Sequence, residues 1–511
     1  MENKTLIYDV EENPKKKSEW VLFAIQHILA MLVACITVPS LTGLPIGSTL
    51  VSAGIGTIIY ILITKKKSPV FLSSSFAYLN AMFSGLAVGV SKSVIDSYGD
   101  FVSFGQSGHA NYAAVMLGMA FVGLVYVIIA LIIKKTGTRW LNKLLPPVVV
   151  GPVIMVIGLS LAGASAVPSV MGGTYAITKL GCSAWYDTLL STGVALVACF
   201  VTAFVAVKGN KTFRLIPFVI GMVSAYLLAL VLSLIGLLAK VDSLQIINLK
   251  MFSEVKWNTI GAWLNVSSSD WMFTLALNSD AAFNIAVVGQ VAILFIPVAL
   301  VTICEHIGDH KNLGNIIGRD LLEEEPGMTR TLIGDGLATA VSGSLCGAAN
   351  TTYGENVAVV GVTRIASVNV ILLAAVMAIG FGFFAPLTLV LSSVPSCITG
   401  GVSLILYGFI ASSGVKMLIK EKVDFNKTKN IIVASVILVS GIGGLTFVFG
   451  SGNSAITVTS TAVSMLLGIF FNLILKDEEK DSERNKSTCW RYGGIYCCCR
   501  QIQCDKSRCY G

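Results

Sequence analysis

The chain has 511 residues, of which 54% are hydrophobic and only 13% are charged. A soluble domain usually carries about twice that charged fraction, and a soluble protein of this length would need polar surface around several cores. The composition therefore excludes an ordinary soluble protein and indicates an all-α polytopic membrane protein.

Fourteen apolar stretches are predicted to be transmembrane segments, because a helix needs about 20 apolar residues to cross a bilayer's hydrocarbon core. The first stretch contains Gln26 and His27, and more spans follow it, so we do not interpret it as a cleavable signal peptide. The predicted spans are residues 20–40, 47–64, 70–91, 111–133, 144–164, 187–207, 214–238, 284–304, 331–347, 350–363, 367–385, 386–413, 429–447 and 455–475.

The net charge is +8, and the positions of the positively charged residues agree with the expected membrane topology. If the N-terminus is cytoplasmic, the predicted cytoplasmic loops hold lysine clusters at 15–17, 65–67, 134–135 and 416–429, and only five of the 36 Lys and Arg residues fall outside. Cytoplasmic loops retain positive charge. We therefore expect a multi-pass protein of the cell (inner) membrane with both termini in the cytoplasm, and no nucleic-acid partner.

Three landmarks recur in the same order in the two halves of the chain. Gln26-His27 in span one corresponds to Glu305-His306 in span eight. The segment that opens span three, Ser74–Tyr78, corresponds to the segment that opens span ten, Thr351–Glu355. Pro146 corresponds to Pro395. The landmarks indicate a duplicated seven-span unit. Because seven is odd, the two copies must cross the membrane in opposite senses, and such inverted repeats are typical of secondary transporters.

Spans three and ten open with segments that are poor starts for a membrane helix. Residues 68–78 and 348–356 are rich in small, hydroxyl and β-branched side chains. Non-helical backbone at membrane depth occurs only where it is buried in protein or lines a cavity. Each segment is predicted to be extended and to lead into a half-helix, so that two helix N-termini point at one ligand.

Ionisable residues inside membrane spans are functional candidates by default. Glu305 closes the apolar run of span eight, and Glu355 lies in the segment that opens span ten. Asp309 and His310 follow Glu305 at the end of span eight, and Asp335 opens span nine; for these three an ordinary cytoplasmic helix end is an equally good interpretation.

Two buried carboxylates would repel a phosphate but suit a neutral heterocycle, because they accept hydrogen bonds from ring N–H groups while backbone N–H groups donate to ring carbonyls. Phe76 and Tyr353 are candidate aromatic neighbours of a flat ring. Burial disfavours the charged form of a carboxyl group, so one acid could take up a proton with the substrate. We expect no cofactor and no metal, with the proton as coupling ion.

In several motifs the chain resembles the nucleobase–ascorbate transporter family, and within it the bacterial uracil permease branch. The resemblance covers most of residues 18–476. It rests on Gln26-His27, Ser74-Ser75-Phe76-Ala77, Glu305-His306-Ile307-Gly308, the run from Asn350 to Asn356 with Thr363-Arg364, and Gly400-Gly401-Val402-Ser403-Leu404 with Tyr407-Gly408.

The resemblance implies a core domain that moves against a gate domain, usually in a homodimer. The implied parts are a cytoplasmic N-terminus (1–19), core (20–134 and 284–385), gate (140–239 and 386–476), an extracellular loop (240–283) and a Cys-rich cytoplasmic tail (477–511). By similarity, the substrate-binding residues would be Phe76, Ala77, Glu305, Tyr353, Gly354, Glu355 and Tyr407, with structural support from Gln26, His27 and Asn356.

The implied function is import of uracil by proton symport. Asp309 stands where uracil permeases can carry His, and Asp309 and Asp335 match acids of purine-transporting members, so xanthine or urate is the alternative substrate. Glu355 favours uracil, because purine members typically have Gln there. The candidates for the proton carrier are Glu305, Asp309, His310 and Asp335. An integral-membrane enzyme is the alternative from another class, and no nucleophile–base motif supports it.

Overall fold

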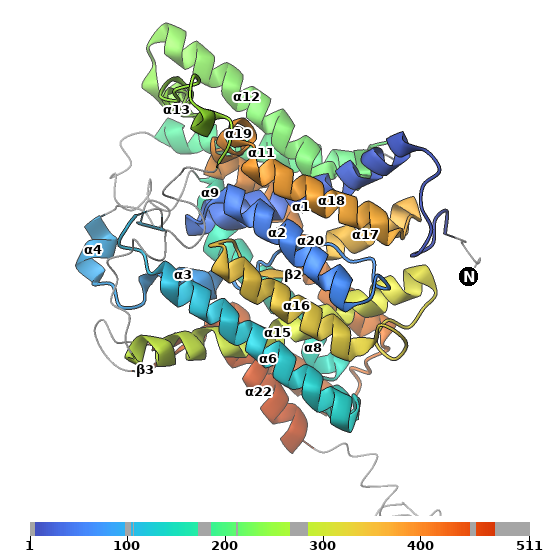
Figure 1. Ribbon diagram of the computed structural model, residues 1–511. Helices are drawn as coiled ribbons and strands as arrows, with labels where there is room; N and C mark the ends of the chain where they lie inside the picture. The colour runs from blue at the N-terminus through green and yellow to red at the C-terminus, as the bar shows by residue number, and fades with distance from the viewer. Residues whose placement is uncertain are drawn as a thin grey trace, which may run out of the picture.

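The computed structural model of the chain is a bundle of helices, many of which run side by side in Figure 1. The structure describes residues 6–97, 104–105, 107–171, 185–210, 213–265, 285–449 and 456–475. The predicted tail at 477–511 and most of the second half of the predicted extracellular loop lie outside these residues.

The first half of the chain contains α1 (Lys17–Thr42), α2 (Ile46–Ile63), α3 (Leu79–Ala87), α4 (Lys92–Ser97), α6 (Tyr112–Thr136), α7 (Arg139–Leu144), α8 (Pro147–Leu161), α9 (Val167–Val170), α11 (Trp185–Lys208), α12 (Pro217–Ala239) and α13 (Lys250–Ser253). The second half contains α15 (Ile285–Ile317), α16 (Gly327–Ser344), α17 (Gly354–Thr363), α18 (Val368–Phe383), α19 (Ala385–Ser392), α20 (Ser396–Lys420), α21 (Thr428–Ile442) and α22 (Ser460–Ile474). The strands are β1 (Leu72–Ser74), β2 (Asn350–Thr352), β3 (Phe447–Phe449) and β4 (Ile456–Val458).

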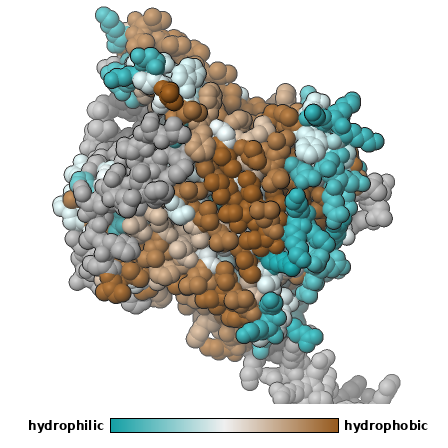
Figure 2. Space-filling view, in the orientation of Figure 1, coloured by the Kyte–Doolittle hydropathy of each residue, from teal (hydrophilic) through white to brown (hydrophobic). Residues whose placement is uncertain are grey.

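Seven of the described helices are long and apolar enough to cross a membrane. They are α1, α2, α6, residues Leu189–Lys208 of α11, α12, α15 and α20. Figure 2 shows hydrophobic side chains over the middle of the visible face and hydrophilic ones along its right-hand edge. A mostly helical chain with several apolar spans agrees with the predicted class, whereas the count of fourteen stays a prediction, because helices such as α3 and α17 are too short to be spans by length alone.

The two extended segments expected at spans three and ten pair with each other. β1 and β2 are antiparallel, with Ser73 opposite Thr351, and all six of their residues are buried. β1 leads through Ser75–Tyr78 into the nine-residue α3, and β2 leads through Tyr353 into the ten-residue α17. The prediction of extended segments that open short helices is confirmed, and the pairing gives their backbone groups partners inside the protein.

The bundle is held together by close helix contacts that glycine permits. α6 packs on α16, and α2 packs on both α16 and α18. α8 and α20 each begin after a proline N-cap, Pro146 and Pro395, and lie against each other. A Cβ on Gly414 of α20 would overlap the carbonyl oxygen of Gly151 in α8, so these two backbones approach as closely as small residues allow.

Two predicted span boundaries are wrong. The single span at 386–413 is divided into α19 and α20, because Pro395 cannot continue the preceding helix and disfavours a helical conformation at Val394. The span predicted to end at 447 ends at Ile442, and the chain then forms β3, which pairs with β4.

The N-terminal segment is tied to the bundle in the structure. The Ile7 backbone N–H donates to the Arg364 carbonyl oxygen at 2.8 Å, and the Ala366 backbone N–H donates to the Tyr8 carbonyl oxygen at 2.9 Å. Asp9 Oδ2 forms an ion pair of 2.6 Å with Arg319 Nη2. The segment therefore links the end of α17 to the connection between α15 and α16.

Candidate functional site

The start of α17 lies beside two acids of α15. Glu355 is in the first turn of α17, and Glu305 and Asp309 are one turn apart on α15. Gly354 at the start of α17 is close to Asp309, since a Cβ there would lie in van der Waals contact with Asp309 Oδ1, at 3.4 Å. The fold therefore brings Glu355 beside two carboxyl groups that lie about 50 residues before it in the sequence.

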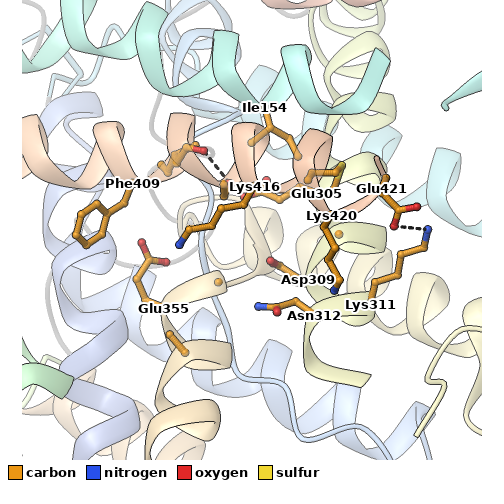
Figure 3. A pocket seen from close by; sticks show the side chains of 16 residues that line it. Ile154, Glu305, Asp309, Lys311, Asn312, Glu355, Phe409, Lys416, Lys420 and Glu421 are labelled. Atoms are coloured by element: carbon orange, nitrogen blue, oxygen red, sulfur yellow. Dashed lines mark hydrogen bonds and ion pairs between the residues drawn. The ribbon is translucent and has the colours of Figure 1, made fainter. Parts of the chain in front are cut away.

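These three acids line a cavity of about 320 Å³, shown in Figure 3. This volume is at the lower end of roughly 300–1,000 Å³ that is usual for small-molecule sites. α15 and α17 form one wall, while Ile154 of α8 and Phe409 of α20 lie on the other. The cavity thus has three acids on one side, and both apolar and charged side chains on the other.

The three carboxylates differ in their contacts. Thr352 Oγ1 at the end of β2 donates to Asp309 Oδ2 at 2.8 Å. Among the residues that the structure describes, no side chain donates a hydrogen bond to Glu305 or Glu355, and both are partly accessible from the cavity. Glu305 and Glu355 are therefore the acids free to accept from a ligand.

A buried polar layer lies behind the cavity. His306 Nδ1 and Asp335 Oδ2 are 2.8 Å apart, and both side chains are fully buried. The other carboxylate oxygen of Asp335, Oδ1, has no hydrogen-bond partner among the described residues. His310 Nε2 lies 2.6 Å from Tyr60 Oη.

Asp335 does not open its helix, as the sequence suggested, because α16 begins eight residues earlier at Gly327. His310 is also fully buried, and α15 continues to Ile317. The interpretation of Asp335 and His310 as ordinary helix ends at a water-exposed surface is therefore wrong.

The residues expected to support the site form a link between the halves of the chain. His27 Nδ1 of α1 and Asn356 Oδ1 of α17 are 2.9 Å apart and buried. The neighbouring Gln26 is buried, and its Oε1 has no hydrogen-bond partner among the described residues. His27 and Asn356 thus fix α17 against α1 rather than facing the cavity.

Four of the expected substrate neighbours lie outside the lining of this cavity. Phe76 and Tyr407 contact each other edge to face, with ring centroids 5.3 Å apart. Tyr353 is buried with an unpartnered hydroxyl among the described residues, and Ala77 is partly buried. Gly354, Glu305 and Glu355 do line it. The roles of Phe76, Ala77, Tyr353 and Tyr407 toward a substrate stay predictions.

Sequence reasoning missed several polar residues of the cavity. Lys416 and Lys420 of α20 line it, together with Lys311 and Asn312 of α15. The lysines of α20 belong to the 416–429 cluster that we interpreted as topology alone. Their i,i+4 spacing at the end of an apolar helix was the available signal, because it places both on one face. Among the described residues, no group of three His, Cys, Asp or Glu side chains could hold a metal ion.

A family model described as "Permease family" matches residues 18–449. The chain is 38% identical over 479 residues to the uracil permease of Bacillus caldolyticus, covering 93% of this chain and 96% of that protein. It is 37% identical to the uracil permease of Bacillus subtilis, over 91% of this chain and 94% of that protein. It is 31% identical to the uracil permease of Escherichia coli K12, over 89% of this chain and 92% of that protein.

Solved transporter structures share the fold at low sequence identity. The transmembrane domain of the cyanobacterial bicarbonate transporter BicA matches with a TM-score of 0.56 and 12% identity, over 91% of this chain and 99% of that one. The murine anion transporter Slc26a9 in the inward-facing state matches with a TM-score of 0.60 and 12% identity, over 91% of this chain and 69% of that one. Together with the apolar helices, these matches indicate a multi-pass membrane protein with a transporter fold.

Proposed function

Because the chain belongs to the Permease family, we propose that it is a secondary transporter that imports uracil together with a proton. The uracil permeases that it resembles match it over most of their length. The transporter fold supports carriage across a membrane rather than catalysis, so an integral-membrane enzyme is not the function we favour.

The observation that carries the proposal is the pair Glu305 and Glu355 in one cavity without side-chain partners among the described residues. Uracil presents two ring N–H donors and two carbonyl acceptors. Two carboxylates can accept from the N–H groups, and the backbone N–H of Gly354 at the start of α17, for which no acceptor is seen among the described residues, can donate to a carbonyl. Phe409 lines the cavity beside these acids, and the predicted contacts of Phe76 and Tyr407 with the ring would require these two side chains to turn toward the cavity.

The coupling proton would be held by the same acids. Glu305 and Asp309 lie one turn apart beside Glu355, and three neighbouring carboxylates cannot all be ionised without strong repulsion. Proton uptake by one of them would therefore accompany uracil binding. Asp335 and His310 lie in the buried polar layer behind and are further candidates for carrying that proton.

Alternating access would come from motion of a core domain (20–134 and 284–385) against a gate domain (140–239 and 386–476). The cavity lies between α15 and α17 of the core and α8 and α20 of the gate, which supports this division. The pairing of β1 with β2 and of α8 with α20 supports a seven-plus-seven inverted repeat with fourteen spans. We further propose a homodimer in the cell membrane with both termini cytoplasmic.

Reconstituted protein tests the transport proposal. In proteoliposomes with an inwardly directed proton gradient, radiolabelled uracil should accumulate above equilibrium, and a protonophore should abolish the accumulation. Glu355→Ala should lose uptake. Uptake that never exceeds equilibrium would indicate a passive channel, and formation of a product would indicate an enzyme. Competition by unlabelled xanthine or urate, stronger than by unlabelled uracil, would favour the purine alternative that Asp309 and Asp335 suggest.

A further inference from the structure

The cavity contains unpaired groups of opposite charge on its two walls. Glu421 on the α20 side forms an ion pair of 3.6 Å with Lys311 of α15. Asp309 accepts from Thr352. Among the described residues, Glu305 and Glu355 remain without a side-chain partner, and so do Lys416 and Lys420 of α20.

Of these two lysines, Lys416 is the one that faces the binding acids. In Figure 3 its ammonium end extends across the cavity toward the Glu355 carboxylate. Lys416 lies one turn closer than Lys420 to the middle of the apolar helix α20. The two groups are not within ion-pair distance in this structure, so a change of lysine rotamer or a small approach of the two walls is needed to join them.

From this arrangement, we propose that Lys416 is a positioning residue that neutralises Glu355 when the carrier is empty. The inference rests on the proposed function. After uracil and the proton leave, an ionised Glu355 would remain in a poorly solvated cavity without a partner, which is costly. Lys416, on the opposite wall of the cavity, then replaces the ring N–H as the partner of Glu355.

Two consequences follow for transport. Uracil must displace Lys416 from Glu355, so the lysine weakens uracil binding and speeds its release. Return of the empty carrier, with its charge neutralised, is also faster with Lys416 present. Exchange of uracil for uracil needs no empty return, so it depends on the lysine only through the rate of uracil release.

The test compares Lys416→Gln with the wild type in three assays on the full chain. We expect the uracil Kd of the purified variant to fall about two- to fivefold, the effect of one partly exposed ion pair. Net uptake into proteoliposomes should slow by more than uracil–uracil exchange does, because only net uptake includes return of the empty carrier. High salt should tighten uracil binding by the wild type and leave the variant unaffected.

Lys416→Arg should behave as the wild type, and Lys416→Met should repeat the result of the Gln variant with a side chain of similar length. Lys422→Gln is the matched control, because it removes a positive charge from the exposed end of α20 outside the cavity lining. An unchanged or weaker uracil Kd in Lys416→Gln, or equal loss of exchange and net uptake, would overturn the inference. Wild-type protein that neither binds nor exchanges uracil would overturn the proposed function, and this inference with it.

Discussion

His27 and Asn356, which are 329 positions apart in the chain, contact each other through His27 Nδ1 and Asn356 Oδ1 at 2.9 Å. Since Asn356 Oδ1 is an acceptor, His27 Nδ1 carries the proton. The contact joins the first apolar helix to the short helix that carries Glu355. Glu355 therefore depends for its position on a residue from the other half of the chain.

Replacing Asn356 by Ala should destabilise the protein, because it leaves the buried His27 N–H without its acceptor. The expected cost is about 1–3 kcal/mol, measured as a fall in the denaturation midpoint of the detergent-solubilised protein. Asn369→Ala is the control, because it removes an exposed hydrogen bond to Asn13 and should change the stability little. Equal stability of the two variants would show that the buried contact does not hold α17.

Gly414→Ala should destabilise the protein more than Gly408→Ala, although both lie in α20. A Cβ at Gly414 would meet the Gly151 carbonyl oxygen and lie 2.7 Å from Met155 Cγ, whereas a Cβ at Gly408 has no heavy atom within 4 Å. We expect a loss of about 1–3 kcal/mol at Gly414, and no loss at Gly408, where Ala is the better helix former. Thermal unfolding of the two variants checks this, and a Gly408 variant as unstable as the Gly414 one would contradict the packing.

Thr352→Val should impair transport without unfolding the protein. Valine keeps the shape of threonine but removes the hydroxyl that donates to Asp309. Asp309 would then lose its fixed orientation beside Gly354, and we expect about a tenfold fall in the initial uptake rate, since hydrogen bonds to charged groups contribute about 1.5–3 kcal/mol. Thr352→Ser retains the hydroxyl and should retain most of the uptake. If the Val variant were as active as the Ser variant, the Thr352 hydroxyl would have no role in transport.

The contact of Glu325, in the loop between α15 and α16, with Lys67 should make a pH-dependent contribution to the stability of the protein. Lys67 Nζ donates to its carboxylate at 2.6 Å, and this hydrogen bond, with the charges of Lys67 and Lys65, lowers the pKa of Glu325. A pKa that is lower in the folded state stabilises the protein above the unfolded value of about 4.3. The contribution is lost as the pH falls through the folded pKa.

The difference in thermal midpoint between the wild type and Glu325→Gln should therefore be small but constant near neutral pH, should decline below about pH 4.3, and should vanish once the pH is below the lowered pKa of the folded state. Glu254→Gln, which removes an exposed carboxylate elsewhere, should show no such difference at any pH. A wild-type advantage that persists at low pH would argue against the Lys67 contact.

The sequence was sufficient to predict the class of fold and the opening of spans three and ten, because apolar runs and residues unsuited to helix are local signals. It also predicted that Glu305 and Glu355 lie together, whereas for Asp309 an ordinary helix end was an equally good interpretation. It could not place Asp335, because the eight residues of α16 before it are not apolar enough to appear as part of a span. Nor could it show that Lys416 lines the cavity, because a lysine near a helix end has the same pattern whether it faces solvent or a cavity wall.

The N-terminal segment and the strands β3 and β4 were also beyond prediction from sequence. The contacts of Ile7 and Tyr8 are backbone hydrogen bonds to residues more than 350 positions away, and three-residue strands leave no periodic pattern to recognise. What sequence could not supply was therefore long-range contact rather than local conformation.

The most direct test of the site is uracil binding to the purified protein by calorimetry, for the wild type, Glu305→Gln, Glu355→Gln and the exposed control Glu254→Gln. A carboxylate that accepts from a ring N–H should contribute about 1.5–3 kcal/mol, so each cavity variant should bind uracil at least about tenfold more weakly. The control should bind as the wild type does. Undiminished uracil binding by both cavity variants would contradict the assignment of Glu305 and Glu355 as the groups that hold the nucleobase.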